Sequence, residues 1–476
     1  MVEVRNIVFS SLIFLFVFLP IILLGYYVVK DEYKNYFLLL SSLVFYAWGE
    51  PFYIFLMLFS IFINYIFGLL VCENRSYRKF WLILSVVFNI GFLGAFKYTG
   101  FFLSNVNSIF NLNFTVPVIE LPLGISFFTF QALSYVIDVY RGNAIVQKNL
   151  LNIALYISLF PQLVAGPIVK YQTVADQIVS RSHSIEKFGE GVNRFLVGMG
   201  KKILIANPLG VVADSIFTIP AGEISVLTSW TGVIAYTLQI YFDFSGYSDM
   251  AIGLGKMFGF EFLENFNYPY IAQNVSEFWR RWHISLGSWF REYVYIPLGG
   301  NRVSKIRVYL NIFTVWMLTG FWHGASWSFI AWGMYFGILI CIEKAFMLKL
   351  LSKVYRPLRH VYLILIIIIG WVFFRANSFT YSIEYLKTMF GLNNVPLIDN
   401  LSYVYLHDNW VTIILGILFS APIVKWIKNK IMLKNVRLLE NNFTYFLEAT
   451  GYMILFLLVI LKLVNSSYNP FLYFRF

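Results

Sequence analysis

The sequence predicts an all-α polytopic membrane protein with about 11 to 13 transmembrane helices. Of its 476 residues, 59% are hydrophobic and only 13% are charged, which is too little charge to cover the surface of a water-soluble domain. Apolar runs long enough to cross roughly 30 Å of hydrocarbon recur along almost the whole chain. We therefore expect a multi-pass protein of the cell membrane.

The clearest predicted spans are five apolar runs. The first is too long for the core of a signal peptide and has no small-x-small cleavage site before Lys30, so we expect a retained first helix. The fourth run is long enough for one long span or a pair of spans. In chain order, the runs cover residues 7–29, 52–72, 80–96, 311–342 and 443–464.

The formal net charge of +12 would suggest nucleic-acid binding in a soluble protein. Here Lys and Arg gather between the apolar runs, as expected at a cytoplasmic face, so we expect contact with membrane lipids and none with nucleic acid. Cys72 and Cys341 lie in or at the end of apolar runs, which favours buried thiols over a disulfide or a metal site. The basic clusters cover residues 74–79, 181–202, 343–360 and 425–437.

The chain has no low-complexity linker and no convincing internal repeat, so we predict a single membrane-embedded domain over residues 1–476. Its longest polar stretches are residues 170–202, 260–307 and 377–408, and long loops in a compact protein usually serve function.

A helix over residues 277–293 would have an apolar arc rich in Trp and a basic opposite side, with His283 at the boundary. Such a helix suits the membrane interface, because indole favours the headgroup level and guanidinium favours phosphate. The predicted arc holds Trp279, Trp282, Leu286, Trp289, Phe290 and Tyr293, and the predicted opposite side holds Arg280, Gly287 and Arg291.

The stretch TGFWHGASW, residues 319–327, places His323 inside an apolar run. Ionisable side chains within membrane segments usually serve function, and a neutral imidazole can act as a general base near neutral pH. The alternative is a packing histidine that hydrogen-bonds across helices. Small residues spaced by four would let neighbouring helices or a long substrate approach closely: Gly320, Gly324 and Ser328, and then Gly333 and Gly337.

His283 has an alternative interpretation too, because a half-exposed histidine in an interfacial helix is often only part of its amphipathic surface. Two histidines on different elements suffice for a base and an orienting or electrophilic partner. They are too few for a metal site, and no HExxH motif or Cys pair accompanies them. We therefore expect no metal and no bound cofactor.

Asp243 and Asp249 lie six residues apart in an otherwise apolar segment. Each costs roughly 2.5 to 3.5 kcal/mol at mid-membrane, so each needs a partner or a water-filled cavity. A structural or pocket-lining role is favoured over a proton path. Lys201 and Lys202 open another apolar run, where they either set topology or meet phosphates of a donor.

Together these segments resemble the membrane-bound O-acyltransferase family, and specifically its bacterial polysaccharide branch, which includes alginate O-acetyltransferase membrane subunits. The resemblance extends to about residue 375, with a core at residues 121–345, whereas residues 376–476 match in hydropathy only. Gly287 and Glu292 stand where Ser and Asp are expected in the alginate branch. The matching segments are residues 121–142, 160–171, 241–260, 264–302 and 318–337.

The resemblance implies tilted helices, including interfacial or re-entrant ones, around a central funnel with a cytoplasmic entrance and an outer vestibule. It makes His323 the signature histidine and His283 the second important one. It also implies three partners: an acyl thioester such as acetyl-CoA, an extracytoplasmic acyltransferase or esterase-like protein, and a polysaccharide acceptor. The expected activity is transfer of a short acyl group to a hydroxyl outside the membrane.

In this hypothesis His323 is the general base, and His283 positions the donor or supports the oxyanion. Other residues expected at the substrate or channel are Asp243, Asp249, Asn265, Asn267, Trp279, Arg280, Trp282 and Trp322. Three alternatives stay open: transfer of D-alanyl or another acyl group to a cell-wall polymer, a transporter that uses the two aspartates for ion coupling, and a scaffold of a polysaccharide secretion complex.

Overall fold

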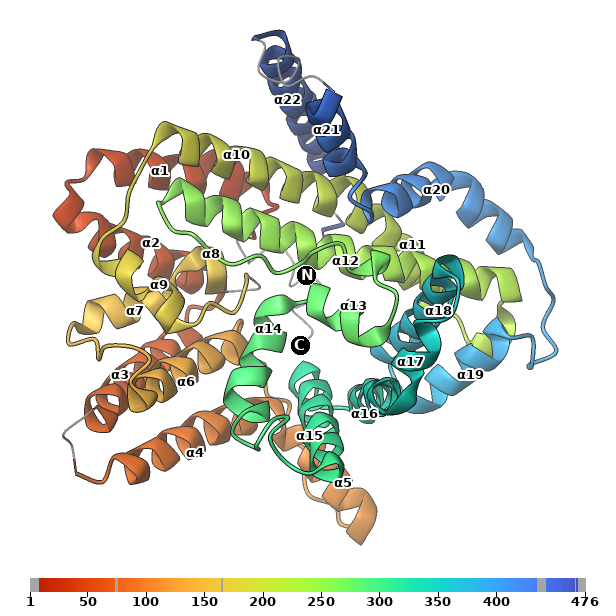
Figure 1. Ribbon diagram of the computed structural model, residues 1–476, viewed down its shortest axis with the longest axis horizontal. Coiled ribbons are helices and arrows are strands. Elements are labelled where there is room, and N and C mark those ends of the chain that lie inside the picture. The colour runs from red at the N-terminus through yellow and green to blue at the C-terminus, as the bar shows by residue number, and fades with distance from the viewer. Residues whose placement is uncertain (1–7, 73–75, 164–165, 435–441, 467, 470–476) are drawn as a thin grey trace. The chain divides into compact units, whose positions relative to one another are not determined.

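A computed structural model of the chain describes residues 8–72, 76–163, 166–434, 442–466 and 468–469. Within these ranges the regular structure is helical and no residue lies in a strand, so the predicted all-α class is confirmed (Figure 1). Parts of several predicted segments lie outside the described residues: residue 7 of the first run, residues 74–75 and 435–437 of two basic clusters, and residues 164–165 of one matching segment.

Five helices in the described ranges are long and apolar enough to cross a membrane. Three of them coincide with the predicted runs at residues 52–72, 80–96 and 443–464, and the first run forms a shorter apolar helix over Phe14–Val28. The total of about 11 to 13 crossings stays a prediction. The five helices are Tyr53–Val71, Arg78–Lys97, Ile185–Phe217, Arg356–Arg375 and Phe443–Asn465.

The helices form two compact units, and the prediction of a single domain is left open. Unit 1 comprises Met1–Phe195 and Met250–Leu263. Its helix α6 is buried along most of its length and packs against α3 and α4, which an Asn64–Asn89 amide pair joins with N–O distances of 3.1 and 2.8 Å. Its elements are η1 (Phe14–Phe18), α1 (Leu19–Val28), η2 (Asp31–Tyr33), α2 (Lys34–Gly49), α3 (Tyr53–Val71), α4 (Arg78–Lys97), α5 (Thr99–Phe110), α6 (Ile125–Arg141), α7 (Leu150–Ser158), α8 (Phe160–Leu163), α9 (Tyr171–Val179) and most of α10 (Ile185–Gly200).

Unit 2 comprises Leu196–Asp249 and Glu264–Phe476. Its elements are η3 (Lys201–Ala206), α11 (Asn207–Phe217), η4 (Ala221–Glu223), most of α12 (Val226–Met257), η5 (Pro269–Ile271), α13 (Val275–Arg281), α14 (Ile284–Phe290), η6 (Arg291–Tyr295), α15 (Lys305–His323), α16 (Trp327–Ile342), η7 (Glu343–Met347), α17 (Leu348–Leu351), α18 (Arg356–Arg375), α19 (Phe379–Met389), α20 (Asn400–Phe419), α21 (Ile423–Lys434) and α22 (Asn442–Asn465).

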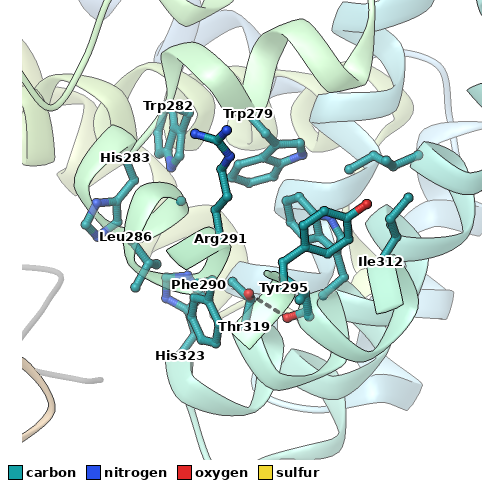
Figure 2. A pocket seen from close by; sticks show the side chains of 14 residues that line it. Trp279, Trp282, His283, Leu286, Phe290, Arg291, Tyr295, Ile312, Thr319 and His323 are labelled. Atoms are coloured by element: carbon teal, nitrogen blue, oxygen red, sulfur yellow. Dashed lines mark hydrogen bonds between the residues drawn. The ribbon is translucent and has the colours of Figure 1, made fainter. Parts of the chain in front are cut away.

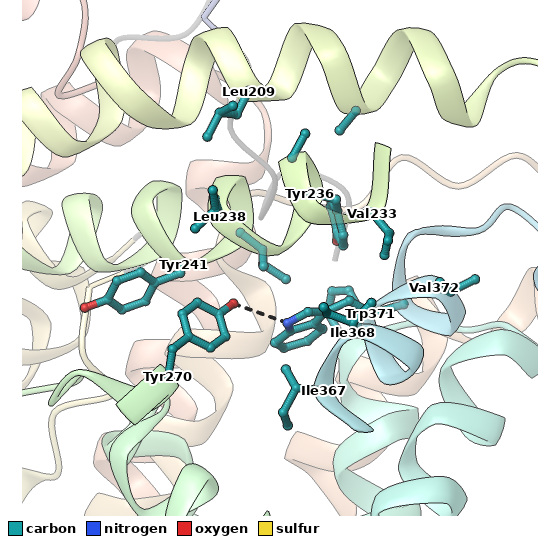
Figure 3. Packing of buried hydrophobic residues seen from close by; sticks show 14 of the residues in the cluster. Leu209, Val233, Tyr236, Leu238, Tyr241, Tyr270, Ile367, Ile368, Trp371 and Val372 are labelled. Atoms are coloured by element: carbon teal, nitrogen blue, oxygen red, sulfur yellow. Dashed lines mark hydrogen bonds between the residues drawn. The ribbon is translucent and has the colours of Figure 1, made fainter. Parts of the chain in front are cut away.

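The core of unit 2 is aromatic and contains a short polar relay between helices. Trp371 of α18 donates its indole N–H to the hydroxyl of Tyr270 at 3.3 Å (Figure 3). That hydroxyl donates to the carbonyl of Thr237 in α12 at 2.6 Å. All three residues are buried. Since a buried indole N–H or phenol needs a partner, this relay fixes how α18 and α12 pack.

The two aspartates of α12 are ion-paired with lysines of the π-helix η3. Lys202 Nζ lies 2.6 Å from Asp243 Oδ1, and both side chains are 2% exposed. Lys201 Nζ lies 2.6 Å from Asp249 Oδ2. Carboxylates in an apolar segment require such partners. The two lysines therefore pair with aspartates of their own chain and not with the phosphates of a donor.

The run at residues 311–342 forms a pair of helices, α15 and α16, separated at residues 324–326. Gly320 and Gly333 let the pair pack closely, because a Cβ on Gly320 would collide with the carbonyl of Phe329 and a Cβ on Gly333 with that of Trp316. The predicted stripe through Gly324 and Ser328 is wrong in one respect. Helix α15 ends at His323, so the two residues do not share a helix face with Gly320.

The single helix predicted over residues 277–293 is also wrong. Figure 1 shows two short helices, α13 and α14, in its place. The chain breaks at Trp282, which is extended, and at His283, whose φ of 44° and ψ of 54° lie in the left-handed region. The π-helix η6 then continues from α14. The break and the π turn shift the phase of the helix, so the predicted separation into two faces fails.

Candidate active site

Unit 2 contains a cavity of about 200 Å³ whose lining includes both His283 and His323 (Figure 2). The lining comes from α13, α14, η6, α15 and α16. Its other polar side chains are Arg291, Tyr295 and Thr319, while the remaining lining side chains are aliphatic or aromatic. Both imidazoles were expected to act at one site, and the cavity brings them together although they lie forty residues apart on different elements.

His283 lies in the break between α13 and α14, where it holds the left-handed conformation described above. That conformation is uncommon for a residue other than glycine and is often retained at functional sites. The side chain is buried, and its Nδ1 lies 3.2 Å from Oδ1 of Asn265. The ring of Phe244 meets the imidazole edge to face, with 4.5 Å between ring centroids.

The hydrogen bonds around Asn265 assign the tautomer of His283. Asn265 Oδ1 accepts from the backbone N–H of Ser285 at 3.1 Å and from its hydroxyl at 2.8 Å. An oxygen that accepts from a backbone N–H is an acceptor, so His283 Nδ1 donates to it and the lone pair lies on Nε2. His283 is outside the five spanning helices, and burial lowers its pKa to about 3. The imidazole is therefore neutral at physiological pH.

His323 is the last residue of α15 and is buried among aromatic rings. Its ring centroid lies 5.0 Å from that of Trp322, 5.1 Å from Trp332 and 5.1 Å from Phe374. Trp322 also lies 6.4 Å from the ring of His283, so one indole contacts both imidazoles. This aromatic surround limits water near the ring and fixes its orientation.

The other predicted site residues divide into three groups. Trp279 and Trp282 line the cavity with the histidines. Asn265 and Trp322 are buried behind it, in contact with those histidines. Four residues lie elsewhere: Arg280 and Asn267 are exposed and outside the lining, and the aspartates are in the ion pairs described above.

Sequence reasoning missed several cavity residues. Gly287 and Arg291 were predicted opposite the Trp arc, yet they line the same cavity as Trp279 and Trp282 because the helix is broken between them. Thr319 and Trp316 also line it. They precede His323 by four and seven residues, so helical spacing alone could have identified them.

Glu343 was also missed, although it positions the cavity wall. This buried carboxylate accepts from the backbone N–H of Val275 at 2.7 Å, and from the backbone N–H and the hydroxyl of Ser276, both at 2.8 Å. It thereby caps the first turn of α13, where a negative charge is favourable. The carboxylate thus links the end of α16 to the helix that carries Trp279.

The fold and the cavity together define a class of protein: a multi-pass membrane enzyme with a small, mainly apolar site that holds two imidazoles. Residues 143–383 match the model of the membrane-bound O-acyltransferase family, MBOAT. The chain belongs to this family and is an O-acyltransferase.

Three relatives illustrate the range of similarity. The chain is 40% identical to the probable alginate O-acetylase AlgI of Azotobacter vinelandii, over 98% of this chain and 100% of the relative. It is 36% identical to the peptidoglycan O-acetyltransferase of Helicobacter pylori, over 98% and 97% of the two chains. It is 29% identical to the teichoic acid D-alanyltransferase of Bacillus subtilis, over 47% and 59%.

Proposed function

We propose that this enzyme transfers an acetyl or similarly short acyl group from a cytoplasmic thioester, such as acetyl-CoA, to a hydroxyl of a cell-surface polysaccharide. Transfer reaches the polymer directly or through an extracytoplasmic acyltransferase or esterase-like partner. The observation that carries the proposal is the single small cavity lined by both His283 and His323. Two relatives that match over nearly their whole length are named as an O-acetylase and an O-acetyltransferase, which supports acetyl as the transferred group.

The size of the cavity supports a short acyl group. Its volume is about 200 Å³. An acetyl thioester with an attacking hydroxyl has few heavy atoms at its reacting centre, whereas a fatty acyl chain has far more. The mainly apolar lining also disfavours water, which would hydrolyse the thioester.

In the proposed reaction the acceptor hydroxyl attacks the thioester itself. His323 takes the proton of the acceptor hydroxyl while the oxygen attacks the thioester carbonyl carbon, a role worth roughly 10² to 10⁴ in rate. The new C–O bond forms and the C–S bond breaks. The imidazolium of His323 then returns the proton to the departing thiolate, so the products are an ester and a free thiol.

The tautomer of His283 narrows its role. Because Nδ1 donates to Asn265 and Nε2 carries the lone pair, the neutral ring accepts a hydrogen bond at Nε2. That suits an N–H or O–H group of the donor or acceptor and disfavours donation to an oxyanion. We therefore assign His283 to positioning, with Trp279 and Trp282 as walls of the site.

Charge at the cavity favours acetyl over D-alanyl. A D-alanyl thioester carries an ammonium group, whose usual partner is a carboxylate. Among the described residues that line the cavity there is one guanidinium, of Arg291, and no carboxylate. The D-alanyltransferase relative also covers less than half of this chain.

The test is the O-acetyl content of the cell-surface polysaccharide in cells that carry the parent protein or His323→Ala, with membrane abundance measured in parallel. We expect His323→Ala to lower acetylation at least 100-fold at normal abundance. His407→Ala is the matched control, because His407 is exposed and paired with Asp408. Normal acetylation with His323→Ala would make this histidine a packing residue, and substrate flux in proteoliposomes without acyl donor would then test the transporter.

A further inference from the structure

Gly287 is a glycine that neither the backbone nor the packing requires. It lies inside α14, and its φ is outside the left-handed region that favours glycine. A Cβ built on it would have the carbonyl oxygen of Trp279, 4.0 Å away, as its nearest neighbour. Gly320 and Gly333, in contrast, have no room for a Cβ. Since glycine destabilises a helix interior relative to alanine, the absent side chain at position 287 serves another purpose.

The open space in front of Gly287 is the cavity itself. Gly287 is exposed and lines the cavity together with both histidines. Its backbone N–H donates to the carbonyl of His283 at 3.1 Å, and its carbonyl accepts from the backbone N–H of Arg291. Gly287 therefore lies one turn after the positioning histidine and one turn before the cationic side chain of the lining.

We propose that Gly287 determines the size of acyl group that the enzyme accepts. Without a side chain at this position, the cavity has room for one or two methylenes beyond acetyl, so the parent enzyme uses propionyl as well as acetyl thioesters. A side chain at position 287 would fill this space and restrict transfer to acetyl. This inference rests on the acyl transfer proposed above and identifies the residue that sets its donor range.

The expected size of the effect follows from apolar pockets in general. One methylene in such a pocket changes selectivity by about 10 to 200-fold. We therefore expect the parent enzyme to prefer acetyl over propionyl by less than about tenfold, and Gly287→Val to raise this preference by at least about tenfold. Gly287→Ala should give a smaller change in the same direction.

The experiment uses membrane vesicles from the producing cells, which retain the native acceptor, supplied with an equimolar mixture of acetyl-, propionyl- and butyryl-coenzyme A. Ester-linked acyl groups are released with alkali and counted by mass spectrometry for the parent, Gly287→Ala and Gly287→Val. Gly91→Val is the matched control, because a Cβ on Gly91 of α4 meets nothing within 4 Å, and Gly91 lies far from the cavity in sequence and in another unit.

A rising acetyl-to-propionyl ratio along the series from Gly to Ala to Val, with Gly91→Val equal to the parent, supports the proposal. An unchanged ratio overturns it, and so does an equal loss of all three acyl groups, because the space would then belong to the acceptor or to the common part of the donor. If Gly287→Val does not accumulate, the ratio for Gly287→Ala decides. Absence of ester from every thioester in the parent vesicles would instead refute the proposed function.

Discussion

Replacing either Lys202 or Asp243 alone should destabilise the protein, whereas replacing both together should not. Their charged atoms lie 2.6 Å apart and both side chains are 2% exposed, so neither charge can gain hydration when its partner is removed. We expect Lys202→Met to lower the free energy of unfolding by about 3 to 5 kcal/mol, because Asp243 becomes a buried, uncompensated charge. Asp243→Leu should cost a similar amount for the converse reason.

The double variant Lys202→Met with Asp243→Leu shows whether the loss of stability comes from the unpaired charge that each single variant leaves. Replacing a buried ion pair by apolar residues of similar volume is often neutral or stabilising, so the double variant should recover most of the loss. The exposed pair Lys387 and Glu384, 2.9 Å apart, supplies the control, because Lys387→Met should change stability by less than about 1 kcal/mol.

The assay is thermal unfolding in detergent, followed by tryptophan fluorescence, together with the amount of protein inserted in the membrane. Our interpretation of this pair as structural is refuted if Lys202→Met is as stable as the parent, or if the double variant is less stable than both single variants. Substrate flux that depends on these two residues would instead favour the transporter.

Two further predictions concern the support of the cavity. Asn265→Ala removes the acceptor of His283 Nδ1 and should lower kcat about tenfold. An unchanged kcat would contradict the assigned tautomer. The control is Asn267→Ala, because Asn267 is exposed. Glu343→Ala leaves buried N–H groups of α13 without their acceptor and should lower stability by about 1 to 3 kcal/mol, measured by the same thermal assay. Glu343→Gln, which retains one side-chain acceptor, should lose less, and equal losses would argue against capping.

The fold class and the main spans were predictable because hydropathy is a local property. The runs at residues 52–72, 80–96 and 443–464 each match a helix, since a helix is the structure in which an apolar segment in a membrane satisfies its backbone within itself. The break after Arg281 was not predictable in this way. The periodicity of residues 277–293 fits one helix, and the left-handed His283 is stabilised by Asn265 from a distant loop.

The candidate site was predictable in its residue types but not in its geometry. A histidine within an apolar run identified His323, and the Trp-rich segment together with the family resemblance identified His283. The need of carboxylates for partners anticipated the ion pairs of Asp243 and Asp249. The sequence could not place Gly287 on the cavity, because its position depends on a break in the helix that precedes it.

The sequence by itself determined the membrane class, the helical segments and the two histidines, because hydrophobicity, turn residues and isolated ionisable groups are read along the chain. Only the tertiary structure decided that both imidazoles line one small cavity, that Lys201 and Lys202 neutralise the two aspartates, and that the space at Gly287 is open to the site. These facts are distances between residues far apart in sequence, and they are set by how the helices pack.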